Sequence, residues 1–236
     1  MKTDRFRVPE NEAEAVAEQD RLRMLVEPDG PVPAPLRLIA GLDVAYAVDE
    51  SCVAGAVTLL DADETLELVE TATVLRPVDF PYVPGLLAFR EIPALLDALA
   101  RLERVPDVLV CDGYGLAHPR RFGLACHLGV LTGIPTFGVA KTAFIGRYDD
   151  PGPERGAATD LAESGEVVGR VLRTRSGTKP VFVSVGHRIG LAAATELTLR
   201  LTTPGYRLPE TTRQADQASR RALAGSRGSS GLGPVT

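Results

Sequence analysis

The stretch 36-LRLIAGLDVAYAV-48 is the first of three strand-like runs that define the fold. The runs 52-CVAGAVTLL-60 and 66-LELVETATVL-75 follow it, and only the short connections AVDES and DADET separate the three. Apolar runs joined by so few residues are typical of antiparallel hairpins. The sequence therefore predicts that its first half contributes three consecutive antiparallel strands to one sheet.

The second half of the chain alternates between strands and helices. The predicted strands are 107-DVLVCD-112, 135-PTFGVAK-141, 166-EVVGRVLRT-174 and 179-KPVFVSVG-186, with a polar loop before the third. Helical patterns cover residues 10–26, 86–103, 119–131, 190–201 and 210–223. This order predicts an α/β fold in which helices flank a mixed sheet of three antiparallel strands followed by parallel strands. It fits a ribonuclease H-like sheet, although the order alone does not separate that fold from other mixed sheets.

Length and composition are typical of one globular domain. The chain has 236 residues, of which 44% are apolar and 24% are charged. We expect the domain to span residues 1–223 and the Gly/Ser-rich tail 224–236 to be disordered. The charged N-terminus resembles no signal peptide, and no apolar run is long enough to cross a membrane, so we expect a cytoplasmic protein without membrane contact. The sequence shows no exposed apolar stripe, and we expect a monomer.

The cysteines Cys52, Cys111 and Cys126 are odd in number and widely spaced within apolar runs. Disulfide frameworks and zinc sites use even or closely spaced sets of cysteines. These three are therefore predicted to be small core residues with free thiols.

The formal net charge of −5 is unusual for a protein that binds nucleic acid, but the charge is unevenly distributed. No acidic residue lies between Gly113 and Tyr148 or between Val167 and Thr195, and both segments contain several arginines. A basic face on an acidic protein is typical of local phosphate binding with low non-specific affinity. Arg120 and Arg121 are predicted to meet the phosphates of a bound strand.

Three acidic residues stand among apolar neighbours. Asp43 lies in the middle of the first strand, Asp112 ends the strand 107–112, and Glu91 lies in the apolar turn FREIPALL. A carboxylate in such surroundings is costly unless a cation meets it, and each acid alone is more often structural. If the first and fourth strands are neighbours, however, the two aspartates converge at the end of the sheet, and a covering helix can add the glutamate. Such an oxygen-only pocket favours Mg²⁺, with Mn²⁺ as a substitute, and supports hydrolysis of a phosphodiester.

His118 and Lys141 are the basic candidates beside this acidic centre. The sequence carries lysine only at positions 2, 141 and 179, and it uses arginine wherever any positive charge would serve. A lysine kept at a strand end therefore indicates a need for a compact ammonium group.

Several blocks resemble the endonuclease V family of the ribonuclease H-like superfamily. They are IAGLDVAY, 81-PYVPGLLAFRE-91, 107-DVLVCDGYGLAHPRRFGLACHLG-129, 135-PTFGVAKT-142, 184-SVGH-187 and 204-PGYRLPETTRQAD-216. They keep the order of the family and span nearly the whole chain before the tail. Thr211 departs from the family pattern, which has proline there.

The resemblance implies a Mg²⁺-dependent nuclease that recognises deoxyinosine in DNA and nicks the same strand at the second phosphodiester bond 3′ to the lesion, leaving a 3′-hydroxyl and a 5′-phosphate. It implies that Asp43, Asp112 and Asp216 bind metal and that Glu91 does so as the catalytic glutamate. His118 and Lys141 match residues close to the scissile phosphate. The remaining matches are DNA-binding positions, a wedge that separates the strands and a pocket for the flipped base: Pro81, Tyr82 and Pro84, and Leu87, Gly113, Gly115 and Gly138.

Two alternatives stay open. A module that binds inosine-containing nucleic acid without cutting it would be expected to lack one of the acids, and all four acidic positions are filled here. An inosine-specific ribonuclease would use the same residues, because nothing in the sequence reports on a 2′-hydroxyl contact. RNA containing inosine therefore stays a candidate partner beside DNA.

Overall fold

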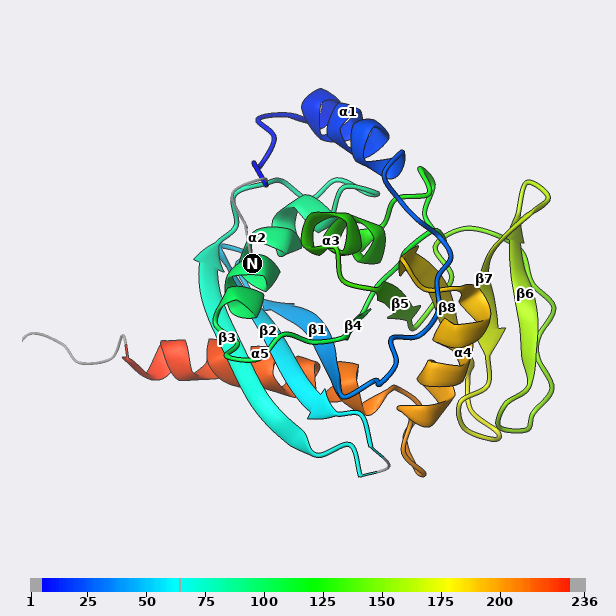
Figure 1. The fold of residues 1–236 in the computed structure, drawn as a ribbon. Helices are drawn as coiled ribbons and strands as arrows, with labels where there is room; N and C mark the ends of the chain where they lie inside the picture. Colours follow the sequence, from blue (N-terminus) through cyan, green and yellow to red (C-terminus); the bar gives the residue numbers. More distant parts are fainter. Residues whose placement is uncertain (1–5, 64, 230–236) are drawn as a thin grey trace, which may run out of the picture.

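The computed structural model, which describes residues 6–63 and 65–229, is built on a mixed sheet with helices on both faces (Figure 1). The strands are β1 (Leu38–Tyr46), β2 (Cys52–Asp61), β3 (Leu68–Pro77), β4 (Val108–Cys111), β5 (Thr136–Ala140), β6 (Ala158–Glu163), β7 (Glu166–Leu172) and β8 (Val181–His187). The helices are α1 (Glu12–Arg23), α2 (Ala88–Ala100), α3 (Leu124–Thr132), α4 (Leu191–Arg200) and α5 (Glu210–Ser229). The predicted α/β class is confirmed.

The strand order is β3-β2-β1-β4-β5-β8-β7-β6. As predicted, β1, β2 and β3 form an antiparallel unit, and parallel strands follow it: β4 pairs with β1, and β5 pairs with β4. The last three strands return to antiparallel pairing. The sheet is therefore mixed, with its parallel part confined to its centre.

The sequence prediction missed β6, which was assigned to a polar loop. Its residues, ATDLAE, alternate only weakly, because the strand lies at the edge of the sheet and buries Leu161 alone. The turn that joins it to β7 is Ser164–Gly165, and both residues have positive φ angles. That is the two-residue turn that antiparallel hairpins favour, so the Ser-Gly pair was the available signal.

Two further boundaries differ from the prediction. Helix α3 begins at Leu124 instead of residue 119, because Arg121 has a φ of 54° and the chain turns before Gly123. Helix α5 continues to Ser229, beyond the predicted end at residue 223. The rest of the expected tail, 230–236, lies outside the described residues.

Two helical layers enclose the sheet. Helices α2 and α3 cover one face, and α4 and α5 cover the other, while α1 packs on the outer side of α3 (Figure 1). Each face has its own apolar core, represented by Leu42, Leu95 and Leu109 on one side and by Val110, Phe137 and Leu197 on the other. Successive side chains of a strand point to opposite faces of the sheet. Asp43 and Asp112 therefore lie on the face that α5 covers.

Cys52, Cys111 and Cys126 have free thiols, and the last two are buried in the core, as predicted. Within the described ranges, none of the helices combines the length and the apolar character that crossing a bilayer requires.

Two glycines let helices from opposite layers approach the sheet. A Cβ atom at Gly41 in β1 would lie 2.0 Å from the main-chain oxygen of Thr211, at the start of α5. A Cβ atom at Gly55 in β2 would lie 2.7 Å from the main-chain carbon of Ala94 in α2. These contacts leave no room for any side chain, and they bring the helices that carry Asp216 and Glu91 down onto the strands.

We expect Gly41→Ala to lower the free energy of unfolding by about 1–3 kcal/mol, because the added methyl group forces β1 and α5 apart. Gly225→Ala is the matched control, since an added Cβ there meets no atom within 4 Å and alanine favours a helix over glycine. Urea denaturation of both variants measures the difference. Equal stability of the two variants would contradict the tight contact between β1 and α5.

Candidate active site

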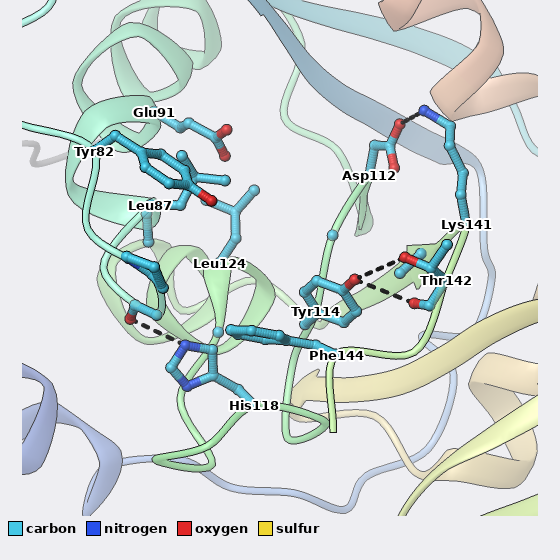
Figure 2. Close-up of a pocket in the computed structure, with 16 residues that line it drawn as sticks. Tyr82, Leu87, Glu91, Asp112, Tyr114, His118, Leu124, Lys141, Thr142 and Phe144 are labelled. Atoms are coloured by element: carbon cyan, nitrogen blue, oxygen red, sulfur yellow. Dashed lines mark hydrogen bonds and ion pairs between the residues drawn. The ribbon is translucent and has the colours of Figure 1, made fainter. Parts of the chain in front are cut away.

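A pocket of about 390 Å³ opens beside the ends of the central strands, between the start of α2 and the loops that follow β4 and β5 (Figure 2). Its volume lies in the range of ligand sites, roughly 300–1,000 Å³. The lining includes eight of the residues that the sequence singled out: Tyr82, Pro84, Leu87, Glu91, Asp112, Gly113, His118 and Lys141. The structure thus brings most of the predicted site together.

Figure 2 shows Glu91 and Asp112 on opposite walls of this pocket. Asp112 follows the last residue of β4, and Glu91 lies in the first turn of α2. The parallel register of β1 and β4 pairs Leu42 with Cys111, so Asp43 and Asp112 are the next residues on adjacent strands. The predicted convergence of the two aspartates is therefore a consequence of the strand pairing.

The carboxylates lack enough positive charge around them. Burial, followed by the charge of Asp112, raises the pKa of Asp43 to about 8. Burial, followed by the charges of Asp43 and Asp112, raises the pKa of Glu91 to about 8. Asp216 adds a weaker repulsion to Asp43 from the side of α5, while its own side chain pairs with Arg220 at 2.9 Å. Like charges in a low-dielectric environment account for these directions.

Lys141 supplies one cation to this group. Its ammonium donates a hydrogen bond to Oδ2 of Asp112. Although burial opposes the charge, this bond and the neighbouring carboxylates hold the pKa of Lys141 above its ordinary value. Lys141 therefore stays charged and pairs with Asp112, as Arg220 pairs with Asp216, and neither cation forms an ion pair with Asp43 or Glu91.

The chemistry of the site fits a hard divalent cation, because every candidate ligand is a carboxylate oxygen. The raised pKa values of Asp43 and Glu91 show that these carboxyl groups lack a positive partner. The side chains are not gathered around a single point, however. Among the described residues, no group of three or more His, Cys, Asp or Glu side chains is placed to hold a metal ion. The chemistry of the site therefore suits a metal, and binding one would require the carboxylates from the two layers to come together.

The other half of the pocket is apolar and aromatic. The ring centroids of Tyr114 and Phe144 lie 5.3 Å apart, and those of His118 and Phe144 lie 5.6 Å apart. The hydroxyl of Tyr114 donates to the main-chain oxygen of Thr142 at 3.1 Å, which ties the loop after β5 to the turn after β4. Leu87 and Leu124 line the same compartment. A planar aromatic group can stack there beside the carboxylates.

The 81–85 loop, with the sequence PYVPG, forms the rim on the side of α2. Phe80 and Leu86 anchor its two ends in a small apolar cluster. Tyr82 is 65% exposed at the tip, and Pro84 and Gly85 line the pocket, whereas Pro81 does not. The loop thus presents an aromatic ring to solvent between two fixed ends.

The structure places His118 and Arg120 in contacts that the phosphate prediction did not foresee. Nε2 of His118 and Nη2 of Arg120 lie 3.0 Å and 2.9 Å from the main-chain oxygen of Gly85. Nδ1 of His118 accepts from the main-chain N–H of Arg120, so the imidazole is neutral with its proton on Nε2. Burial, followed by the charge of Arg120, lowers the pKa of His118 to about 4. A neutral imidazole offers no positive charge to a phosphate.

The other arginines of the basic segments are largely neutralised by acids elsewhere in the chain. Arg121 pairs with Glu166 at 2.8 Å. Three more arginines make the same kind of contact: Arg170 with Asp160, Arg173 with Asp150, and Arg188 with Glu27. Arg120 and Arg175, by contrast, bond to neutral oxygens, so the basic stretches are neutralised only in part.

Gly113 lines the pocket, but Gly115 and Gly138 lie behind it. A Cβ atom at Gly115 would lie 1.9 Å from the main-chain oxygen of Val185, and one at Gly138 would lie 2.3 Å from that of Gly113. These two glycines allow main chain to pack on main chain under the pocket floor. Their contribution to a ligand would be indirect.

Sequence reasoning missed several residues of the site. Leu124, Thr142 and Phe144 line the pocket but belong to stretches that read as ordinary helix and loop. Gln19, in α1, is fully buried and bonds to the 81–85 loop. Gln19 lies 66 residues from Gly85 in the chain, and no local pattern links the two.

Comparison with known proteins identifies the family. The model of the endonuclease V family matches residues 20–217. Endonuclease V of Streptomyces avermitilis is 56% identical over 91% of this chain and 92% of the relative. A crystal structure of endonuclease V from that organism superposes with a TM-score of 0.89 at 56% identity, covering 93% of this chain and 96% of that one. A crystal structure of Ciona intestinalis endonuclease V in complex with a 23mer DNA containing an inosine followed by a ribo-adenosine has a TM-score of 0.80 at 27% identity, covering 91% and 97%.

With a family model over most of its length and relatives at this identity, the chain belongs to the endonuclease V family and is an endonuclease.

Proposed function

We propose that this protein is a Mg²⁺-dependent DNA repair endonuclease that recognises deoxyinosine and nicks the same strand at the second phosphodiester bond 3′ to the lesion. The products are a 3′-hydroxyl and a 5′-phosphate. Mn²⁺ is expected to replace Mg²⁺, because both ions accept oxygen ligands.

One observation carries the proposal: a recess with an aromatic half and an acidic half. Tyr114 and Phe144 form one end, and Glu91 and Asp112 stand at the other. A flipped base can enter the aromatic end while the backbone that carries it runs past the carboxylates. The Ciona intestinalis relative, in complex with inosine-containing DNA, supports this choice of ligand.

The 81–85 loop suits the extrusion of a base from a duplex. Flipping costs a few kcal/mol of stacking, and least for a poorly paired base such as hypoxanthine. An exposed ring at the tip of a loop that contains two prolines can fill the gap that the base leaves behind. Tyr82 has the exposure that this role requires.

In the reaction, Asp43, Asp112, Glu91 and Asp216 would hold the metal. When bound, Mg²⁺ supplies Lewis-acid activation of the phosphodiester and of the attacking water. Lys141 is fixed beside Asp112, where its ammonium offsets the negative charge that develops on the phosphate. His118 is neutral, so we propose that it forms part of the pocket wall and that Lys141 alone offsets the negative charge on the phosphate.

Two alternatives are separable from this proposal. A binding module would recognise inosine without cutting, and a ribonuclease would cut inosine-containing RNA in preference to DNA. The presence of all four acids favours cutting over binding alone. The related complex supports a strand of DNA as ligand, but a ribo-adenosine follows its inosine, so the choice between DNA and RNA rests on the cutting experiment below.

We expect a labelled duplex with one deoxyinosine to be nicked in Mg²⁺ one nucleotide beyond the lesion, and an identical duplex with deoxyadenosine to stay intact. Gel electrophoresis after incubation in Mg²⁺, Mn²⁺ or EDTA measures the cut and its position. Selective binding without a nick would support the binding module, and cutting confined to an RNA version would support the ribonuclease.

We expect Asp112→Asn to lower the rate of cutting by at least about 100-fold, since loss of a group that only supports a metal ligand already costs about 10- to 100-fold. The fold should survive, because the substitution removes one of several mutually repelling carboxylates. Asp160→Asn, which removes an ion pair with Arg170 in β7, is the matched control. A near-normal rate for Asp112→Asn would exclude the proposed metal site.

We expect Tyr82→Ala to lower the cutting of duplex inosine DNA by about tenfold, which is the scale of one base–aromatic stacking contact. Single-stranded inosine DNA should be affected less, because no partner strand has to be separated from the lesion. The ratio of the cutting rates on duplex and single-stranded DNA measures how much Tyr82 contributes to separating the DNA strands. It also corrects for any general loss of activity. An equal loss on both substrates would argue against a wedge.

A further inference from the structure

We propose that Gln19 of α1 is a positioning residue for this endonuclease: its buried amide holds the Gly85 carbonyl and so fixes the 81–85 loop beside the pocket. The inference rests on the function proposed above, in which the 81–85 loop separates the two DNA strands and α1 supports that loop.

Gln19 occupies a position where an apolar residue would be expected. The buried stripe of α1 consists of Ala15, Gln19 and Leu22, at the spacing of one helix face. Gln19 is fully buried, and its neighbours on the stripe pack on Leu86 and Phe122. A buried amide is costly unless its polar atoms are paired, so its contacts explain its presence.

All the polar groups of the Gln19 side chain are used. Nε2 donates to the main-chain oxygen of Gly85 at 3.0 Å and lies 3.4 Å from that of Phe122. Oε1 accepts from Nε of Arg120 at 2.5 Å. Because arginine only donates, the amide oxygen must face Arg120 and the amide nitrogen must face Gly85. Glutamine is suited to the position because it offers a donor and an acceptor on one side chain of this length.

Three donors from two distant segments converge on the Gly85 carbonyl. They are the amide of Gln19 in α1 and the side chains of His118 and Arg120 in the loop after β4. Within the described residues, this carbonyl is the only main-chain group of the 81–85 loop that hydrogen-bonds to a distant segment. Gly85 has a φ of 80°, so the bonds hold the chain at the point where it turns into α2.

The convergence also gives the side chains of Arg120 and His118 partners within the protein. Arg120 is held by both the Gln19 oxygen and the Gly85 oxygen, and His118 shares the second of these. Loss of the Gln19 amide would remove one bond from the loop and leave Nε of Arg120 without its acceptor. The rim of the pocket would then have more freedom to move.

The test compares Gln19→Leu and Gln19→Glu with the control Leu22→Ala. Gln19→Leu removes the whole hydrogen-bonding function at nearly constant volume. Gln19→Glu keeps an acceptor for Arg120 and replaces the donor to Gly85 with a carboxylate oxygen, which repels the Gly85 carbonyl. Leu22→Ala weakens the packing of α1 against Phe122 and Cys126 but leaves the amide in place.

Two quantities are measured on the full-length protein. The first is the ratio of dissociation constants for undamaged and deoxyinosine-containing duplexes, with Ca²⁺ in place of Mg²⁺ so that cutting is slow. The second is hydrogen exchange of the Leu86 amide, which donates to the Val83 oxygen within the turn and needs no DNA. We expect both Gln19 variants to lose about tenfold in the ratio, the scale of one buried hydrogen bond. We also expect both to exchange Leu86 faster, while Leu22→Ala keeps both values near the wild type.

Unchanged selectivity and unchanged exchange in Gln19→Leu would overturn the proposal. An equal loss in Leu22→Ala would also overturn it, because docking of α1 alone would then account for the effect. If the wild type shows no preference for inosine, the proposed function fails, and the exchange of Leu86 still decides whether Gln19 holds the loop.

Discussion

The parallel pairing of β1 and β4 imposes the constraint on which the rest of the site depends. It makes Asp43 and Asp112 the next residues after a paired Leu42 and Cys111, so two carboxylates meet at the end of the sheet. Burial, followed by their mutual repulsion, raises the pKa of Asp43 to about 8. Such a concentration of negative charge lowers stability unless a cation offsets it. The lysine after β5, Lys141, and the helices on both faces of the sheet all lie around these two carboxylates.

The two helical layers make different contributions to the acidic centre. Helix α5 places Asp216 on the same face of the sheet as Asp43, and α2 places Glu91 over the strand ends from the other face. Both approaches depend on strand glycines, Gly41 under α5 and Gly55 under α2. Glu91 and Asp112 thus face one another across the pocket, while Asp43 and Asp216 lie outside its lining, and a divalent ion would have to draw these carboxylates together.

The sequence predicted the parts of the fold that depend on local patterns. Strands β1 to β5 and the convergence of Asp43 with Asp112 follow from apolar runs and from their order along the chain. Strand β6 was missed because an edge strand buries too little to show an alternating pattern. The sequence also did not show the partners of Arg120 and Arg121, which are the neutral oxygens of Gln19 and Gly85 for the first and the carboxylate of Glu166 for the second. Gln19 could not have been found, since its role depends on contacts with residues far away in the chain.

Those internal contacts bear on how the enzyme would discriminate its substrate. The net charge is negative, and Arg121, Arg170, Arg173 and Arg188 are paired with carboxylates, so part of the positive charge of the basic segments is already engaged within the protein. Under the proposed function, stacking in the recess beside Phe144 and insertion of Tyr82 would add affinity that only the lesion permits. Such contacts contribute most when the protein does not have to be ordered on binding. A rim fixed by three hydrogen bonds to one carbonyl meets that condition, and His118 and Arg120 contribute two of those bonds.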